Sequence, residues 1–240
     1  MKRGSGLHYF GVFLLFVASL LLLFVTISAP VINQLGLLKI DLGHMGNKKQ
    51  SYSYSFGTFG FCCLNCGVSG ADRCTGRHIG YEPSRYLSIV QGTPYEDISS
   101  GTADGLTRVM VLHPIACGVA FIAFLLSIGG GIVGSLAGAI AAAVALLLTL
   151  IVMATDFTVF GILKNHVNDD RSASTAHFGD AIWLLVASFI LLFLGMCIVF
   201  FTCCASRREK NRKQAKNREI ASTPVEKPKG GKKKKRFGIF

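Results

Sequence analysis

The chain has 240 residues, of which 51% are hydrophobic and 16% are charged, and its formal net charge is +12. Soluble domains usually carry about 25% charged residues, so this composition argues against an ordinary soluble enzyme, and its long apolar runs exclude disorder for most of the chain. The positive charge is concentrated in residues 205–240, which contain 14 Lys or Arg and 3 Asp or Glu. We therefore expect an almost neutral membrane-embedded body with a cationic tail, and no nucleic-acid partner.

Four apolar segments are long enough to cross a bilayer whose hydrocarbon core is about 30 Å thick. The predicted spans cover about residues 9–28, 109–128, 137–163 and 181–204. The fold class predicted for residues 1–204 is therefore an all-α membrane protein, a four-helix transmembrane bundle, with the small residues near 129–138 forming a short turn. Because basic residues precede the first span, a signal peptide is the alternative for that segment.

The distribution of basic residues predicts the orientation. Lys and Arg are enriched in cytosolic segments close to membrane spans, so the basic tail is expected in the cytosol. An even number of spans then places both termini in the cytosol and the long loop 29–108 outside the cell. The tail from Arg207 onward has no periodic apolar face and contains several Pro and Gly residues, so we expect it to be disordered.

The long first loop is expected to form a small β-sheet on the outer ends of the helices. Residues 51–56 alternate strictly between serine and an aromatic residue, which is the period of a half-buried strand. Residues 31–42 are a weaker strand candidate. Turn residues separate these runs, so an antiparallel sheet is the simplest arrangement.

Four of the eight cysteines, Cys62, Cys63, Cys66 and Cys74, fall in this loop. Outside the cell disulfides persist, and a bridge from the first three to Cys74 would close a small loop. We favour Cys62–Cys74, with Cys63–Cys66 as the second pair, while pairing of Cys74 with Cys63 or Cys66 stays open. In a reducing compartment the spacing of Cys63, Cys66, Cys74 and His78 could instead hold zinc.

Four stretches of the chain, read together, resemble the outer loop and span ends of the fungal PalI family. They are Phe56–Cys62 with Cys74 and Ile79–Tyr81, then Leu106–Ala116, Thr155–Ile162 and Gly179–Trp183. The similarity runs through about residues 9–204, and Cys63 and Cys66 depart from the family pattern.

This resemblance implies a four-span, claudin-like protein of the fungal plasma membrane. It implies an accessory role in ambient-pH signalling, assisting a seven-span pH sensor of the PalH type and, indirectly, its arrestin-like partner. The same superfamily includes structural proteins of eisosomes, so an organiser of a plasma-membrane domain is the alternative function.

The sequence contains no recognisable catalytic set, phosphate-binding loop or metalloprotease motif, so we expect no enzyme activity, cofactor or small-molecule substrate. Asp156 is the one carboxylate within an apolar run, and such an acid is a candidate functional residue. We expect an interfacial or packing-bonded side chain. The alternatives are a pair with His113 of the second span or with a partner helix, and a role in proton sensing.

Two further features lie at the cytosolic side. Cys203 and Cys204 at the end of the fourth span are candidates for palmitoylation, with the unmodified thiol as the alternative. A basic run near the C-terminus is a candidate site for anionic lipid, because each basic residue close to such a surface contributes about 1 kcal/mol of binding. The run comprises Lys232, Lys233, Lys234, Lys235 and Arg236.

Overall fold

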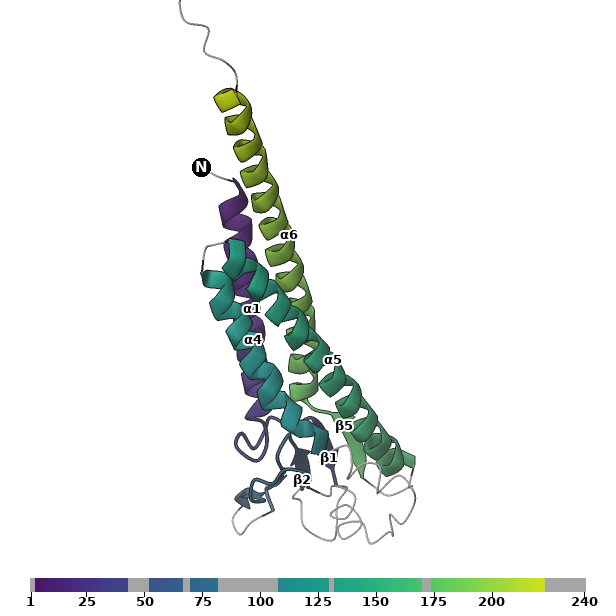
Figure 1. The fold of residues 1–240 in the computed structure, drawn as a ribbon. Helices are drawn as coiled ribbons and strands as arrows, with labels where there is room; N and C mark the ends of the chain where they lie inside the picture. Colours follow the sequence, from purple (N-terminus) through teal and green to yellow (C-terminus); the bar gives the residue numbers. More distant parts are fainter. Residues whose placement is uncertain are drawn as a thin grey trace, which may run out of the picture.

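The computed structural model describes residues 3–42, 52–66, 70–81, 108–129, 132–169 and 174–222. Within these residues, four long helices form a bundle, and a five-stranded sheet covers one end of it (Figure 1). We call this the sheet end, and the opposite end the tail end. The helices are α1 (Arg3–Thr26), α4 (Leu112–Ile128), α5 (Ile132–Asp169) and α6 (Asp180–Ser222), and the short 3-10 helix η2 (Arg108–Val111) precedes α4.

All four helices are long and apolar enough to cross a membrane. Large apolar side chains such as those of Phe13, Leu147 and Phe201 are exposed on the outside of the bundle, as expected where lipid rather than water surrounds it. The predicted fold of a four-span membrane protein with a small antiparallel sheet is confirmed. The helix α1, which contains the first predicted span, packs against both α4 and α6 and is therefore part of the bundle.

The helices form a four-membered ring in which α1 and α5 each contact both α4 and α6. Small residues at helical spacing allow α4 and α5 to approach closely, which is how membrane helices gain packing contacts. The buried alanines are Ala116, Ala120 and Ala123 on α4 and Ala139, Ala142 and Ala145 on α5. Because α5 begins at Ile132, Gly134 and Gly138 lie within the helix and not in the predicted turn.

The sheet has the strand order β4-β3-β2-β1-β5, and all neighbouring strands are antiparallel. The strands are β1 (Leu38–Asp41), β2 (Ser53–Phe56), β3 (Phe61–Leu64), β4 (Arg73–Cys74) and β5 (Thr175–Phe178). The first two lie within the stretches expected to form strands. The strand β5 comes from the connection between α5 and α6, where no pattern in the sequence predicts a strand.

Asn168 of α5 protects the open edge of β5. Its side-chain amide donates to the carbonyl oxygen of Ala176 at 3.1 Å and accepts from the Ala176 N–H at 2.8 Å. An unpaired strand edge is a site for unwanted pairing with other chains, and covering it with a helix is one way to block this. The end of α5 therefore both holds β5 and closes one edge of the sheet.

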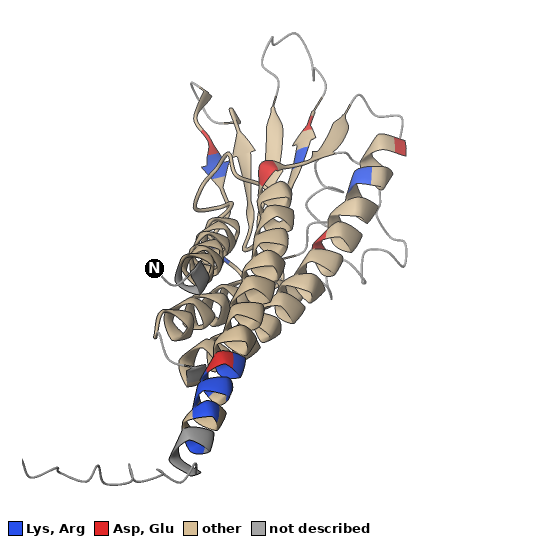
Figure 2. Cartoon of the chain, turned by 90° about the horizontal axis from the view of Figure 1, so that it is seen from above, with Lys and Arg blue, Asp and Glu red and all other residues tan. Residues whose placement is uncertain are grey.

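The prediction of disorder from Arg207 is wrong for residues 207–222, because α6 continues through them as a single helix (Figure 2). The segment is rich in Ala, Arg, Lys, Gln and Glu, which are good helix formers, and it extends a helix that is already nucleated, so it needs no apolar face. Lys213 and Glu209 form an ion pair at i,i+4 spacing. The basic run at Lys232–Arg236 lies outside the described residues.

Candidate functional site at the junction of sheet and bundle

The turn between β2 and β3 is attached directly to the end of α1. Thr58 Oγ1 donates to the carbonyl oxygen of Val25 at 2.9 Å, and the Thr58 N–H donates to Ser28 Oγ at 3.1 Å. A Cβ atom at Gly57 would collide with the backbone of Ala29, so only glycine permits this close approach. The Val25 carbonyl also accepts from the backbone N–H of Ser28 at 3.2 Å, so the turn adds a second donor at the C-terminus of α1 and fixes the sheet on the bundle.

Tyr81 connects this turn to the interior of the bundle. Its hydroxyl donates to the carbonyl oxygen of Gly57 at 2.8 Å, and its ring is buried. Burial raises the pKa of the Tyr81 hydroxyl well above its usual range, and the negative charge of Asp156 raises it further. Tyr81 is therefore a neutral hydrogen-bond donor to the turn after β2.

His113 and Asp156 form a fully buried pair between α4 and α5. The Nε2 atom of His113 lies 3.0 Å from Oδ2 of Asp156, and the side chains are 1% and 0% exposed. His113 is the second residue of α4, so the pair lies at the sheet end of this helix. Oδ1 of Asp156 has no hydrogen-bond partner among the described residues. The structure thus brings together the two residues that sequence analysis gave as an alternative pair.

A second contact defines which protons this pair can hold. His113 Nδ1 lies 3.1 Å from the carbonyl oxygen of Met110 in η2. A carbonyl oxygen can only accept, so this hydrogen bond requires a hydrogen on Nδ1. The contact between Nε2 and Oδ2 then needs one further proton, which belongs either to the imidazolium or to the carboxylic acid. In both arrangements the total charge of the pair is zero. Burying such a pair costs much less free energy than burying an isolated charge.

We name the four side chains Thr58, Tyr81, His113 and Asp156 the junction cluster. It joins the end of α1, the turn after β2, the segment after β4 and the facing helices α4 and α5. Thr58 and Tyr81 were not predicted as site residues, although both lie in stretches that resemble the PalI family. Their role depends on partners that are distant in sequence, so local pattern could not reveal it.

The structure pairs the four cysteines of the first loop as Cys62–Cys74 and Cys63–Cys66. Cys62 and Cys74 are directly opposite each other on β3 and β4. With both pairs formed, none of these sulfurs is a thiolate that could bind zinc. The described residues contain no cluster of three or more His, Cys, Asp or Glu that could hold a metal ion.

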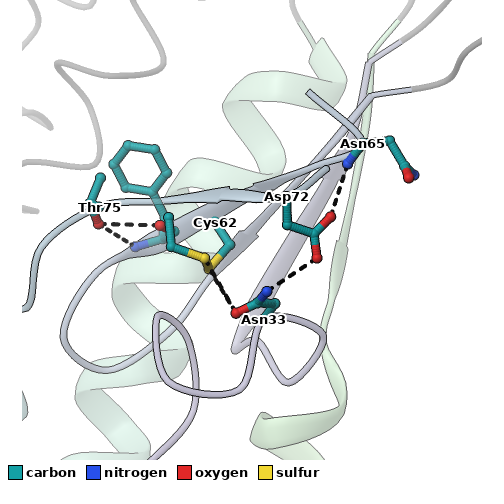
Figure 3. Close-up of a disulfide and its surroundings, with 7 residues drawn as sticks. Asn33, Cys62, Asn65, Asp72 and Thr75 are labelled. Carbon is teal, nitrogen blue, oxygen red and sulfur yellow. Dashed lines mark hydrogen bonds between the residues drawn. A yellow bond between two sulfur atoms is a disulfide. The ribbon is translucent and has the colours of Figure 1, made fainter. Parts of the chain in front are cut away.

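A polar network surrounds the Cys62–Cys74 bridge (Figure 3). The side-chain oxygen of Asn33 contacts both sulfurs, and its amide donates to Asp72 Oδ2 at 3.1 Å. Asp72 Oδ1 accepts from the backbone N–H of Asn65 at 3.1 Å. The bridge and this network together hold β4 against β3 and against the segment that follows α1.

At the tail end, the two palmitoylation candidates differ in accessibility. The side chain of Cys203 is 5% exposed, whereas Cys204 is half-buried and lines a shallow groove together with Phe200, Phe201 and Arg208. His8 also lies at this end, with its ring nitrogens 3.2 Å from Thr202 Oγ1 and from the carbonyl oxygen of Ser127. It connects α1 with α4 and α6, and sequence analysis gave it no role.

The fold and the site define a multi-pass membrane protein with a disulfide-linked sheet seated on one end of a four-helix bundle. The chain belongs to the SUR7/PalI family, whose family model matches residues 7–211. The resemblance seen in the sequence is therefore confirmed.

Two relatives carry names that refer to pH response. The chain is 30% identical over 209 residues to the pH-response regulator protein palI/prr-5 of Neurospora crassa, covering 87% of this chain and 26% of that protein. It is 26% identical over 200 residues to the pH-response regulator protein palI/RIM9 of Pyricularia oryzae, covering 83% of this chain and 24% of that protein. The chain thus spans about a quarter of the length of these curated relatives. Both names describe regulators and not enzymes.

Proposed function

We propose that this chain is a non-enzymatic plasma-membrane accessory protein of ambient-pH signalling that assists a seven-span pH sensor. The observation that carries the proposal is the similarity of most of the chain to two proteins named pH-response regulators. The sensor and the plasma membrane come from the resemblance to the PalI family. The proposal concerns the membrane domain, which is the part that these relatives share with the chain.

The proposal places the sheet end outside the cell and the tail end in the cytosol. Two disulfides lie in the sheet, and disulfides persist in oxidising environments. Basic residues gather at the opposite end, on the last turns of α6 (Figure 2). Trp183 is 60% exposed at the sheet end of α6, and Arg207 follows it by 24 positions, about 36 Å of helix. This spacing suits an interfacial Trp and a cytosolic Arg on either side of one bilayer.

The interior of the bundle favours a role in binding a membrane partner and argues against a role in transport. Apart from the hydroxyl of Ser135, which has no partner among the described residues, the buried hydroxyls in the spans donate to carbonyl oxygens of their own helices and not to one another. They belong to Ser19, Ser127, Thr149 and Ser188. A row of polar groups able to replace the hydration shell of an ion is absent from the described spans. The exposed apolar faces of the helices are instead available to a partner within the bilayer.

The proposal is tested by removing the chain from the cell that makes it and following the sensor. We expect less sensor at the plasma membrane and a weaker response to alkaline medium, both restored when the wild-type chain is reintroduced. Unchanged sensor abundance together with an unchanged alkaline response would contradict the proposal.

A further inference from the structure

We propose that the His113–Asp156 pair is a one-proton latch that joins α4 to α5 and opens when alkaline medium removes its proton. The inference rests on the proposed function, because it needs the sheet end to face the outside medium. It goes beyond that function by naming residues of this chain that would respond to pH themselves.

The geometry makes the contact depend on a single proton. The hydrogen on Nδ1 is held by the Met110 carbonyl, so the 3.0 Å contact between Nε2 and Oδ2 is a hydrogen bond only while one more proton is present. Without that proton, a lone pair on Nε2 faces a negatively charged carboxylate in a site where both side chains are almost completely buried. The attraction between the helices at this point is then replaced by repulsion.

Among the residues that the structure describes, no other cation or hydrogen-bond donor is available to the unprotonated pair. The hydroxyl of Tyr81 already donates to the carbonyl oxygen of Gly57. Cys117, one turn further along α4, donates to the carbonyl oxygen of Ser19 at 3.6 Å, and Arg108 of η2 packs against Gly80 and is exposed. The neighbouring spans contribute no charged side chain, because residues 10–26 and 181–204 contain no Asp, Glu, Lys, Arg or His.

The same contacts connect the latch to the sheet. Met110 O belongs to η2, which leads into α4, and Tyr81 links the site to the turn that holds the sheet on α1. Opening the contact between α4 and α5 would therefore loosen both η2 and the turn after β2, which attaches the sheet to α1. This is a route from a buried proton to the surface that faces the medium.

The sign of the pH dependence follows from counting protons. The closed pair holds the shared proton between Nε2 and Oδ2, whereas the open pair lacks the contact that retains it. The closed state therefore binds more protons than the open state, and its stability falls as pH rises. For one proton, the equilibrium constant for closure should fall by about tenfold per pH unit until the closed pair itself loses the proton.

Hydrogen–deuterium exchange of the full-length protein in lipid nanodiscs tests this between pH 6.5 and 9. Protection factors for peptides covering residues 108–116, corrected for intrinsic exchange, should fall by up to about tenfold per pH unit in the wild type. The Asp156→Asn variant should show no such fall, because its amide can donate to Nε2 without a titratable proton. Asp41→Asn is the matched control, since Asp41 faces His177 at 3.6 Å in a pair that is about half exposed. It should retain the wild-type slope.

A flat wild-type profile, or a slope that persists in Asp156→Asn, would overturn the latch. If Asp156→Asn does not fold, nitrogen NMR of labelled histidine in the wild type decides the question. Loss of the Nε2–Oδ2 proton at the pH where protection falls supports the latch, and a His113 signal unchanged across that range overturns it. Because these measurements use the isolated protein, a failed latch leaves the proposed support of the sensor open, and a missing sensor partner leaves the latch intact.

Discussion

Replacing Cys74 with serine should destabilise the sheet end by about 3 kcal/mol. The bridge joins residues 12 positions apart, and the chain-entropy relation gives about 3 kcal/mol for a loop of that length. The strand β4 has two residues and is exposed, so it depends on this bridge more than the longer strands do. For a chain of this size, 3 kcal/mol corresponds to a fall of roughly 6–12 °C in Tm.

Thermal unfolding of the detergent-solubilised protein under non-reducing conditions measures this shift. Cys197→Ser is the matched control, because Cys197 lies in α6 outside both disulfides. The control should change Tm by much less than Cys74→Ser. Equal Tm values for the two variants would refute the reasoning, as would mass mapping that finds Cys74 as a free thiol in the folded wild-type protein.

Three further predictions concern the helices and the tail. A Cβ at Gly195 would lie 2.9 Å from a side-chain carbon of α1, whereas one at Gly118 would meet nothing within 4 Å; Gly195→Ala should therefore be about 1–3 kcal/mol less stable than Gly118→Ala in denaturant unfolding. Acyl-exchange labelling should decrease in Cys204→Ser and persist in Cys203→Ser, since Cys203 is buried; the reverse pattern would contradict this assignment. A peptide of residues 205–240 should bind anionic vesicles, release as salt rises, and bind less when Lys232–Lys235 become Gln; equal binding to neutral vesicles would leave the tail with only a topological role.

The continuation of α6 changes what the basic tail can do. A helix rises about 1.5 Å per residue, and attraction to lipid headgroups survives screening within about 8–10 Å of the surface. If α6 leaves the membrane along its own axis, Arg207 and Arg208 lie within this layer, whereas Arg218 lies about 17 Å beyond Arg207. Residues 207–218 therefore contribute less to the binding of anionic lipid than a flexible tail would. The prediction of lipid binding then depends mainly on Lys232–Arg236.

The spans could be predicted because their apolar length is a local property that the bilayer thickness imposes. The alternation of serine and aromatic residues is local in the same way, and it correctly predicts a strand at β2. In contrast, β5 forms because Thr175–Phe178 meets the free edge of β1, with Lys39 opposite His177. Four residues between two helices carry no local signal for that pairing.

The site was predictable only in part. Asp156 was recognisable as the one acid in an apolar run, and His113 as a possible partner, because charge inside a membrane segment is costly. The proton arrangement of the pair depends on the Met110 carbonyl, and its link to the sheet depends on Tyr81 and Gly57. Tyr81 and Gly57 are 24 positions apart in the sequence, so their contact follows from the tertiary structure and not from a local pattern.

The most direct test of the proposed function is affinity purification of the tagged, full-length protein from its own cells in mild detergent. The central claim predicts that a seven-span sensor is recovered with the protein and is lost when an unrelated four-span protein is tagged instead. Recovery of eisosome proteins without the sensor would contradict the claim and support the alternative role as a structural organiser of a plasma-membrane domain.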